Sequence, residues 1–224
     1  MKKRIKLCDR LLPNYTRGEE VMNMVTHIVG GGLGIITLAL CVIKAALGRN
    51  IPGVVGCAIY GGCMVALYCM SSIYHGLRPS TGKKVLQVID HCTIYFLIAG
   101  TYTPILLADF VPSYPVIGWG LLGVQWTLAA LAITLTAIDL KKYNIFSMIC
   151  YVGMGWGIVL FLPKAMAVMS APGFYLLLWG GIVYTAGAVL YGIGAKKRWF
   201  HGVFHIFVVL GSLLQFFAIY FYLL

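Results

Sequence analysis

One stretch near the end of the chain, Arg198–His205, reads RWFHGVFH and begins an apolar run that continues to Leu224. In a helix, His201 and His205 are four residues apart and lie on the same face, one above the other. An unpaired polar group in hydrocarbon is costly, and a neutral imidazole is a common metal ligand. The spacing alone therefore fits either a metal site or two histidines that are hydrogen-bonded to neighbouring helices.

The composition is that of a membrane protein. Of the 224 residues, 61% are hydrophobic and only 10% are charged. About 20 mostly apolar residues are needed for a helix to span a bilayer. Seven such runs occur: Val21–Ile43, Ile51–Tyr74, Val85–Leu107, Val116–Ile138, Ile145–Leu162, Gly173–Ile193 and Phe200–Leu223. We therefore expect an all-α membrane protein, with a basic arm at residues 1–20 and one seven-helix transmembrane domain at residues 21–224.

The basic residues predict an orientation. Fourteen of the seventeen Lys and Arg fall in the N-terminal arm or in the loops after the second, fourth and sixth runs. They are Lys2, Lys3, Arg4, Lys6, Arg10, Arg17, Arg78, Lys83, Lys84, Lys141, Lys142, Lys196, Lys197 and Arg198. Only Lys44, Arg49 and Lys164 fall on the other side. The positive-inside rule places the N-terminus in the cytoplasm and the C-terminus outside. The same asymmetry accounts for the net charge of +11, so we expect no nucleic-acid partner.

All five histidines fall near the predicted cytoplasmic end of the bundle. His27 lies early in the first run, His75 follows the second, His91 begins the third, and His201 and His205 begin the seventh. Random placement would scatter histidines over both ends. The clustering at one depth therefore favours a shared site.

Other polar residues share this depth. Asp90 lies inside an apolar run, and an intramembrane carboxylate indicates a functional role. Ser71 precedes the histidine of the second run by four residues and shares its helical face. Glu20, Asn23 and His27 form a polar stripe at positions i, i+3 and i+7, although an acidic residue at a helix start also stabilises the helix dipole.

This set of side chains predicts a zinc site. Catalytic zinc prefers three protein ligands and a fourth position that is open to water, and His75, His201 and His205 can supply those ligands. Bound zinc lowers the pKa of its water to about 7. Asp90 is well placed to deprotonate that water, and Ser71 to orient it or to stabilise an oxyanion.

The remaining polar residues are candidates to support a ligand or to contact the substrate. They are His27, His91, Glu20, Asn23, Tyr95 and Tyr102. His91, Tyr95 and Tyr102 share a helical face that differs from that of Asp90. A fourth ligand, such as His27, would indicate a structural zinc, whereas an open water position would indicate catalysis.

Four motifs occur in order along the chain: E-x-x-N-x-x-T-H from Glu20, S-x-x-x-H from Ser71, DHCTIYFLIAGTYTP from Asp90 and H-x-x-x-H from His201. Together they resemble the hemolysin III family, the bacterial branch of the progestin and adipoQ receptor superfamily, over essentially the whole chain. The resemblance implies an inverted seven-helix topology and a zinc ion near the cytoplasmic face, held by the three histidines named above. It also implies links to ceramidase-like hydrolysis of lipid amides, to haemolysis and to membrane lipid homeostasis.

Three functions stay open at this point. The first is a zinc-dependent hydrolase of an amide or ester bond in a membrane lipid, with apolar helix walls holding the acyl chain. The second is a non-enzymatic sensor of lipid state or membrane energetics, in which zinc fixes one conformation. The third is a cytolytic pore, which needs a polar path along its length, whereas the outer halves of the runs carry only scattered polar groups such as Ser212 and Gln215. In each case we expect an integral protein of a bacterial cytoplasmic membrane.

Overall fold

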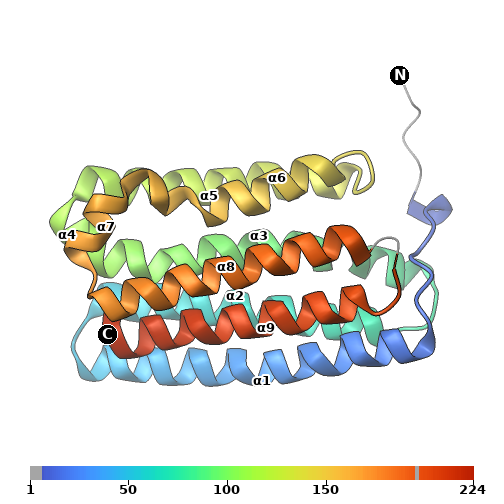
Figure 1. Cartoon of the computed structure of the whole chain (residues 1–224), viewed down its shortest axis with the longest axis horizontal. Coiled ribbons are helices and arrows are strands. Elements are labelled where there is room, and N and C mark those ends of the chain that lie inside the picture. The colour runs from blue at the N-terminus through green and yellow to red at the C-terminus, as the bar shows by residue number, and fades with distance from the viewer. Residues whose placement is uncertain (1–6, 195–196) are drawn as a thin grey trace.

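The computed structural model describes residues 7–194 and 197–224, and those residues form helices and connecting turns without strands. Seven helical segments in the described ranges are long and apolar enough to cross a membrane, which confirms the predicted fold class. The main helix of each segment is, in order, α1 (Arg17–Leu47), α2 (Ile51–Gly76), α3 (Thr81–Ile105), α5 (Pro115–Ile138), α6 (Asn144–Gly155), α8 (Ala171–Gly194) and α9 (Phe200–Ala218). These helices lie side by side along the long axis of the molecule (Figure 1).

Three of the seven segments change helix type along their length. The third contains Pro104, which lacks a backbone N–H, and continues through the π-helix η2 (Leu106–Phe110) into the short α4 (Val111–Ser113). The fifth continues from α6 through the 3-10 helix η3 (Gly157–Phe161) into α7 (Leu162–Val168). The seventh ends in the π-helix η4 (Ile219–Leu223).

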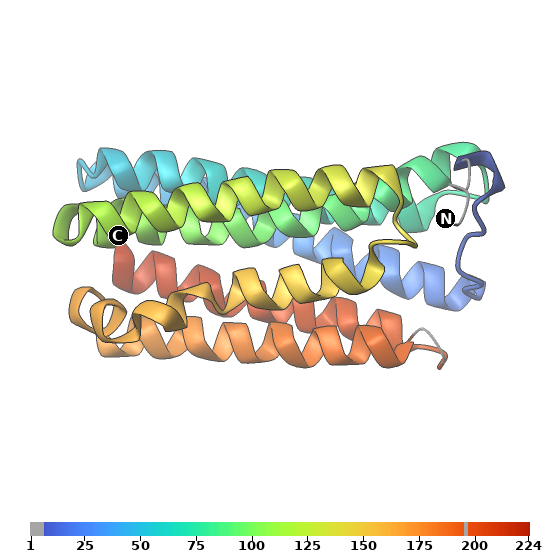
Figure 2. The ribbon, with the colours of Figure 1, turned by 90° about the horizontal axis from the view of Figure 1, so that it is seen from above.

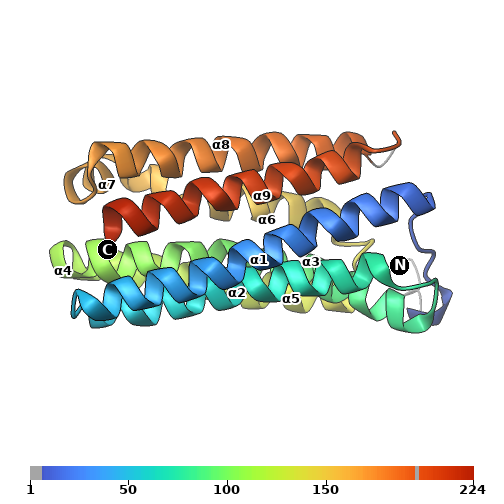
Figure 3. The same cartoon turned by 90° about the horizontal axis from the view of Figure 1, so that it is seen from below.

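The order of packing brings four helix ends together. α2 packs against α1 and α3, α9 packs against α1 and α8, and α3 packs against α5. Figure 3 shows α1 crossing obliquely between α9 and α2. The start of α1, the end of α2, the start of α3 and the start of α9 therefore lie at one end of the bundle, opposite Leu224 (Figure 1). We call this the histidine end.

The predicted orientation places the histidine end in the cytoplasm. Five of the basic residues behind that prediction lie outside the described residues: Lys2, Lys3, Arg4, Lys6 and Lys196. Ahead of α1, residues 7–16 include the short 3-10 helix η1 (Leu7–Asp9), which contacts α3. Figure 2 shows this segment crossing the histidine end from the start of α1.

Burial is arranged as expected for a protein surrounded by lipid. Large apolar side chains such as Ile35, Trp119 and Ile149 are 58–66% exposed on the outside of the bundle, whereas the polar side chains of Asn23 and Ser71 are fully buried inside it. In water this arrangement would leave much apolar surface unpaired. In hydrocarbon it buries the polar groups among the helices, and the protein is therefore an integral membrane protein.

Candidate metal centre and the adjoining cavity

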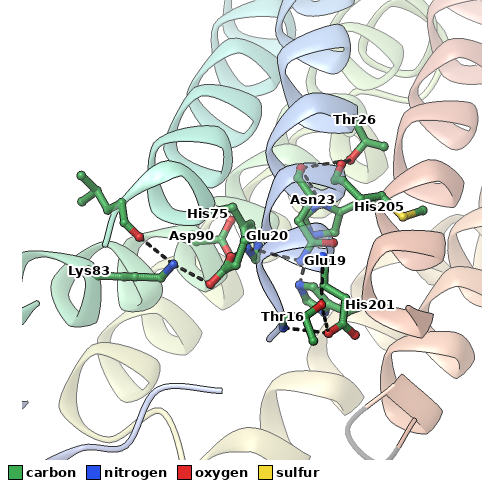
Figure 4. Close-up of polar contacts among 12 residues, drawn as sticks. Thr16, Glu19, Glu20, Asn23, Thr26, His75, Lys83, Asp90, His201 and His205 are labelled. Atoms are coloured by element: carbon green, nitrogen blue, oxygen red, sulfur yellow. Dashed lines mark hydrogen bonds and ion pairs between the residues drawn. The ribbon is translucent and has the colours of Figure 1, made fainter. Parts of the chain in front are cut away.

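Three histidines from two helices meet at the histidine end. His75 lies in the last turn of α2, and His201 and His205 lie in the first two turns of α9. Their side chains are buried, and each offers a ring nitrogen such that the three nitrogens lie within 4.8 Å of one another. The Nε2 atoms of His201 and His205 are 3.1 Å apart. Figure 4 shows these side chains beside the first turns of α1.

The hydrogen-bond partners of two of these rings define their tautomers. His75 Nδ1 lies 2.6 Å from Glu20 Oε2, and His205 Nδ1 lies 3.1 Å from the Asn23 backbone oxygen. A carboxylate and a carbonyl accept but do not donate, so both Nδ1 atoms carry a proton, and in the neutral form of each ring the lone pair is then on Nε2. His75 Nε2 is buried and has no hydrogen-bond partner. A buried lone pair without a donor fits a cation at this point.

The chemistry of the three ligands narrows the choice of ion. Three neutral imidazoles suit zinc and the later first-row transition metals. Magnesium and calcium prefer sets of oxygen ligands. The residues present therefore fit zinc.

Glu19 ties the start of α1 to the start of α9. Thr16 and Glu19 form a capping box, in which the Thr16 backbone N–H donates to Glu19 Oε2 at 2.9 Å. The Trp199 N–H, directly before α9, donates to Glu19 Oε1 at 2.8 Å. Because of this cap, α1 begins at Arg17, ahead of the apolar run that starts at Val21. Glu19 thus helps to place the helix that carries two of the three histidines.

Tyr15 covers the histidines from the end of the bundle. Its ring stacks on His201, with centroids 5.1 Å apart and planes inclined by 23°, and lies 5.9 Å from the ring of His75. Burial raises the pKa of the Tyr15 phenol above its ordinary value, so the ring is neutral at physiological pH. Tyr15 was not among the predicted site residues; the only signal in the sequence is its place directly before the helix cap at Thr16, which puts it close to the site.

A cavity of roughly 160 Å³ adjoins the histidines. His201 and His205 form part of its wall, together with His27, Ser71 and Asp90. Most of the other walls are apolar side chains of α2, α3, α6, α8 and α9, among them Leu67, Ile94, Leu97, Ile98, Met148, Phe204 and Val208. The cavity can therefore hold an apolar chain whose polar group lies beside the histidines.

The two predicted catalytic side chains both line this cavity. Asp90 is half-buried and its Oδ2 lies 3.9 Å from His91 Nδ1, a distance too long for a hydrogen bond. Ser71 is fully buried and its hydroxyl has no hydrogen-bond partner. Among the residues that the structure describes, neither the Asp90 carboxylate nor the Ser71 hydroxyl has a strong hydrogen-bond partner, so both groups are available to a ligand in the cavity.

Comparison with known proteins identifies the family. Residues 15–216 match the family described as Haemolysin-III related. The chain belongs to this family. It is 36% identical to hemolysin-3 of Bacillus cereus over 206 residues, 92% of each chain. It is also 36% identical over 208 residues to the hemolysin-3 homolog of Bacillus subtilis (strain 168), covering 93% of this chain and 96% of the relative.

A more distant relative is human. The monocyte to macrophage differentiation factor of Homo sapiens is 27% identical over 173 residues, which cover 74% of this chain and 69% of the relative. These matches confirm the family that the four sequence motifs predicted.

Two further histidines of this haemolysin-III-related protein lie near the three but differ in their surroundings. The ring of His27 stacks on His205, and neither of its nitrogens has a hydrogen-bond partner. His91 Nδ1 lies 2.8 Å from the Gln87 backbone oxygen, and its Nε2 lies 3.2 Å from the Tyr191 hydroxyl. His91 is thus held by neighbours, whereas His27 faces the site without a polar partner.

Tyr95 and Tyr102 lie away from the three histidines. The Tyr95 hydroxyl is 3.4 Å from Thr136 Oγ1. Tyr95 is not among the residues that line the cavity. The Tyr102 hydroxyl donates to the Gly155 oxygen at 2.8 Å and accepts from the Ile158 N–H at 3.0 Å. Tyr102 therefore stabilises the change from α6 to η3 and contributes one wall of the cavity.

The position of Lys83 in the structure differs from the predicted one. The sequence pattern predicts that Lys83 is one of the charges of the loop after the second run. In the structure it lies in the first turn of α3, is only 3% exposed, and pairs with Glu20 Oε1 at 2.6 Å. The interpretation of Lys83 as a loop charge is therefore wrong, because its ammonium group points inward to a carboxylate of α1.

Proposed function

We propose that this haemolysin-III-related protein binds zinc and hydrolyses an amide or ester bond of a membrane lipid. One observation carries the proposal: three buried imidazoles have nitrogens within 4.8 Å of one another, and two of them, His201 and His205, line a mainly apolar cavity that Asp90 and Ser71 also line. We further propose that the histidine end faces the cytoplasm, in agreement with the positive-inside rule.

Each residue has a defined task in this proposal. His75, His201 and His205 hold the zinc, which supplies a Lewis acid and an activated water when bound. Asp90 accepts a proton from the attacking water and returns it to the leaving nitrogen or oxygen, so that the proton is conserved over the reaction. The Ser71 hydroxyl donates to the carbonyl oxygen as its negative charge grows.

The apolar part of the cavity supports a lipid substrate. Its walls suit an acyl chain, and they exclude bulk water from the carbonyl carbon. The name of the Bacillus relatives refers to haemolysis. A pore would need a polar path through the bundle, and the mainly apolar cavity favours substrate binding over conduction.

Asp90 provides the test of catalysis. Purified protein is reconstituted in liposomes that carry long-chain lipid amides and esters, and released fatty acid is measured by mass spectrometry. We expect Asp90→Asn to keep its zinc and its thermal stability while the rate falls roughly 10²- to 10⁴-fold, the usual contribution of a general acid or base. Asp139→Asn is the matched control, because Asp139 lies at the end of α5 and contacts the Lys142 N–H.

Two results would overturn the proposal that the protein is a hydrolase. One is zinc-loaded wild-type protein that releases no fatty acid from any of these lipids, which would favour the sensor. The other is an Asp90→Asn variant as active as the wild type.

A further inference from the structure

Lys83 is a buried cation that the proposed reaction does not use. Its ammonium group lies 2.6 Å from Glu20 Oε1 and 2.9 Å from the Leu77 backbone oxygen. It also lies 5.2 Å from the centre of the Tyr74 ring. These contacts come from α1 and from the end of α2, whereas Lys83 belongs to α3. One side chain therefore connects three helices at the histidine end (Figure 4).

The local position of Lys83 is unfavourable without these contacts. It is the third residue of α3 after the Ser80 cap, and the partial positive charge of a helix N-terminus disfavours a cation there. Burial of an unpaired ammonium adds a further cost. Lys83 is thus held in place by Glu20 and by the carbonyl at the C-terminal end of α2, which the helix dipole makes attractive to a cation.

Glu20 divides its two oxygens between Lys83 and His75. Oε1 accepts from Lys83, and Oε2 accepts from His75 Nδ1 at 2.6 Å. The side chain of Glu20 is 20% exposed, so without Lys83 it could turn toward the aqueous phase. The ion pair keeps the carboxylate against the imidazole.

A second side chain competes for the same imidazole nitrogen. Asn23 Nδ2 lies 3.4 Å from His75 Nδ1. An amide NH₂ group only donates, so it would favour the tautomer in which Nδ1 accepts and Nε2 carries the proton. That proton would occupy Nε2, the buried nitrogen of His75 that has no hydrogen-bond partner among the described residues. The tautomer of His75 therefore depends on which neighbour, Glu20 or Asn23, is the partner.

We infer that Lys83 is a positioning residue: by holding Glu20 against His75, it fixes the His75 tautomer that leaves Nε2 free to bind a cation. Partners that hold metal-binding histidines in this way typically change metal affinity 10- to 100-fold when they are removed. The inference rests on the proposed metal site for its consequence, but the tautomer itself exists without metal. Lys83 also connects the turn between α2 and α3 to the site.

The test uses Lys83→Met, with Arg78→Met as the matched control. Arg78 is an exposed cation in the same turn, so its variant loses the same charge. In metal-free protein with ¹⁵N-labelled histidine, NMR reports the protonated nitrogen of His75. We expect Nδ1–H in the wild type, in Arg78→Met and in the conservative Lys83→Arg, and a shift toward Nε2–H in Lys83→Met. Competition titration with Zn²⁺ is expected to show a loss of affinity of roughly 10- to 100-fold in Lys83→Met alone.

Glu20→Gln is a second route to the same result, for use if Lys83→Met fails to fold. Its amide has one oxygen and cannot accept from both Lys83 and His75 in the present geometry, so the same tautomer shift is expected. An unchanged tautomer in whichever variant folds would overturn the inference, as would zinc affinity within twofold of the wild type. A wild type with the expected tautomer but no lipid hydrolysis would instead refute the proposed reaction and leave the role of Lys83 intact.

Discussion

His27 and His205 lie face to face, with ring centroids 3.7 Å apart and ring planes inclined by only 10°. His27 is 3% exposed, yet it is not part of the group of three histidines whose nitrogens converge. It therefore contacts the candidate centre through the face of its ring. We therefore do not assign His27 as a fourth ligand of the metal.

The variant His27→Phe tests this role. Phenylalanine keeps an aromatic face against His205 and removes two buried nitrogens that have no partner. Replacing unsatisfied polar atoms with an apolar group of similar shape is close to neutral or stabilising. We expect unchanged zinc affinity and an unchanged or higher melting temperature in detergent. A tenfold loss of zinc affinity would instead identify His27 as a ligand and favour a structural metal.

Tyr15 is expected to slow the exchange of metal with the aqueous phase. An aromatic pair contributes about 0.5–1.5 kcal/mol, so loss of the Tyr15–His201 stack should speed opening of the cover roughly three- to tenfold. The measurement is the rate at which a chelator removes zinc from Tyr15→Ala. Tyr15→Phe keeps the ring and should behave as the wild type. Equal rates in the alanine variant would show that Tyr15 is not the barrier.

Glu19 is expected to contribute to the stability of the bundle. Glu19→Ala removes the reciprocal cap with Thr16 and the acceptor of the Trp199 N–H. We expect a loss of about 1–3 kcal/mol, because both a helix cap and a hydrogen bond to a carboxylate are removed. Thermal unfolding in detergent measures it, with Asp139→Ala as a control at a turn. Equal melting temperatures for the two variants would contradict the role of Glu19.

Two glycines of α1 form a matched pair for testing the packing of α1 on α2. A Cβ atom at Gly30 would lie 2.5 Å from the ring of Tyr68, whereas one at Gly32 would meet nothing within 4 Å. The Tyr68 hydroxyl is bonded to Ser212 at 2.6 Å, so its ring resists displacement. We expect Gly30→Ala to cost about 1–3 kcal/mol and Gly32→Ala to be neutral or stabilising by up to about 1 kcal/mol. Similar unfolding temperatures would contradict this packing.

The seven spans could be predicted because bilayer thickness imposes long apolar runs on the sequence. Their ends were harder to predict, since they depend on individual contacts. The early start of α1 is due to the Thr16–Glu19 cap, and the change from α6 to η3 is stabilised by the Tyr102 hydroxyl, which comes from a different helix. Contacts between different helices cannot be predicted from the hydrophobic pattern of one segment of the sequence.

The grouping of His75, His201 and His205 was predictable from depth and helical spacing, because each lies near a helix end on the same side of the membrane. Lys83 and Tyr15 were not, because both resemble ordinary residues of a loop or an arm. A carboxylate such as that of Glu20 in a polar stripe favours a cation nearby, and Lys83 is a basic residue at the same depth. Only the packing of α3 against α2 shows that it is the partner.

The most direct test of the metal site is the zinc content of purified protein after dialysis, measured by mass spectrometry. We expect one zinc ion per chain in the wild type and in His91→Ala, which removes a histidine of the same end that lies outside the group of three. We expect little zinc in His75→Ala and none in the double variant His201→Ala, His205→Ala. Zinc content equal to the wild type in either of these last two would contradict the account.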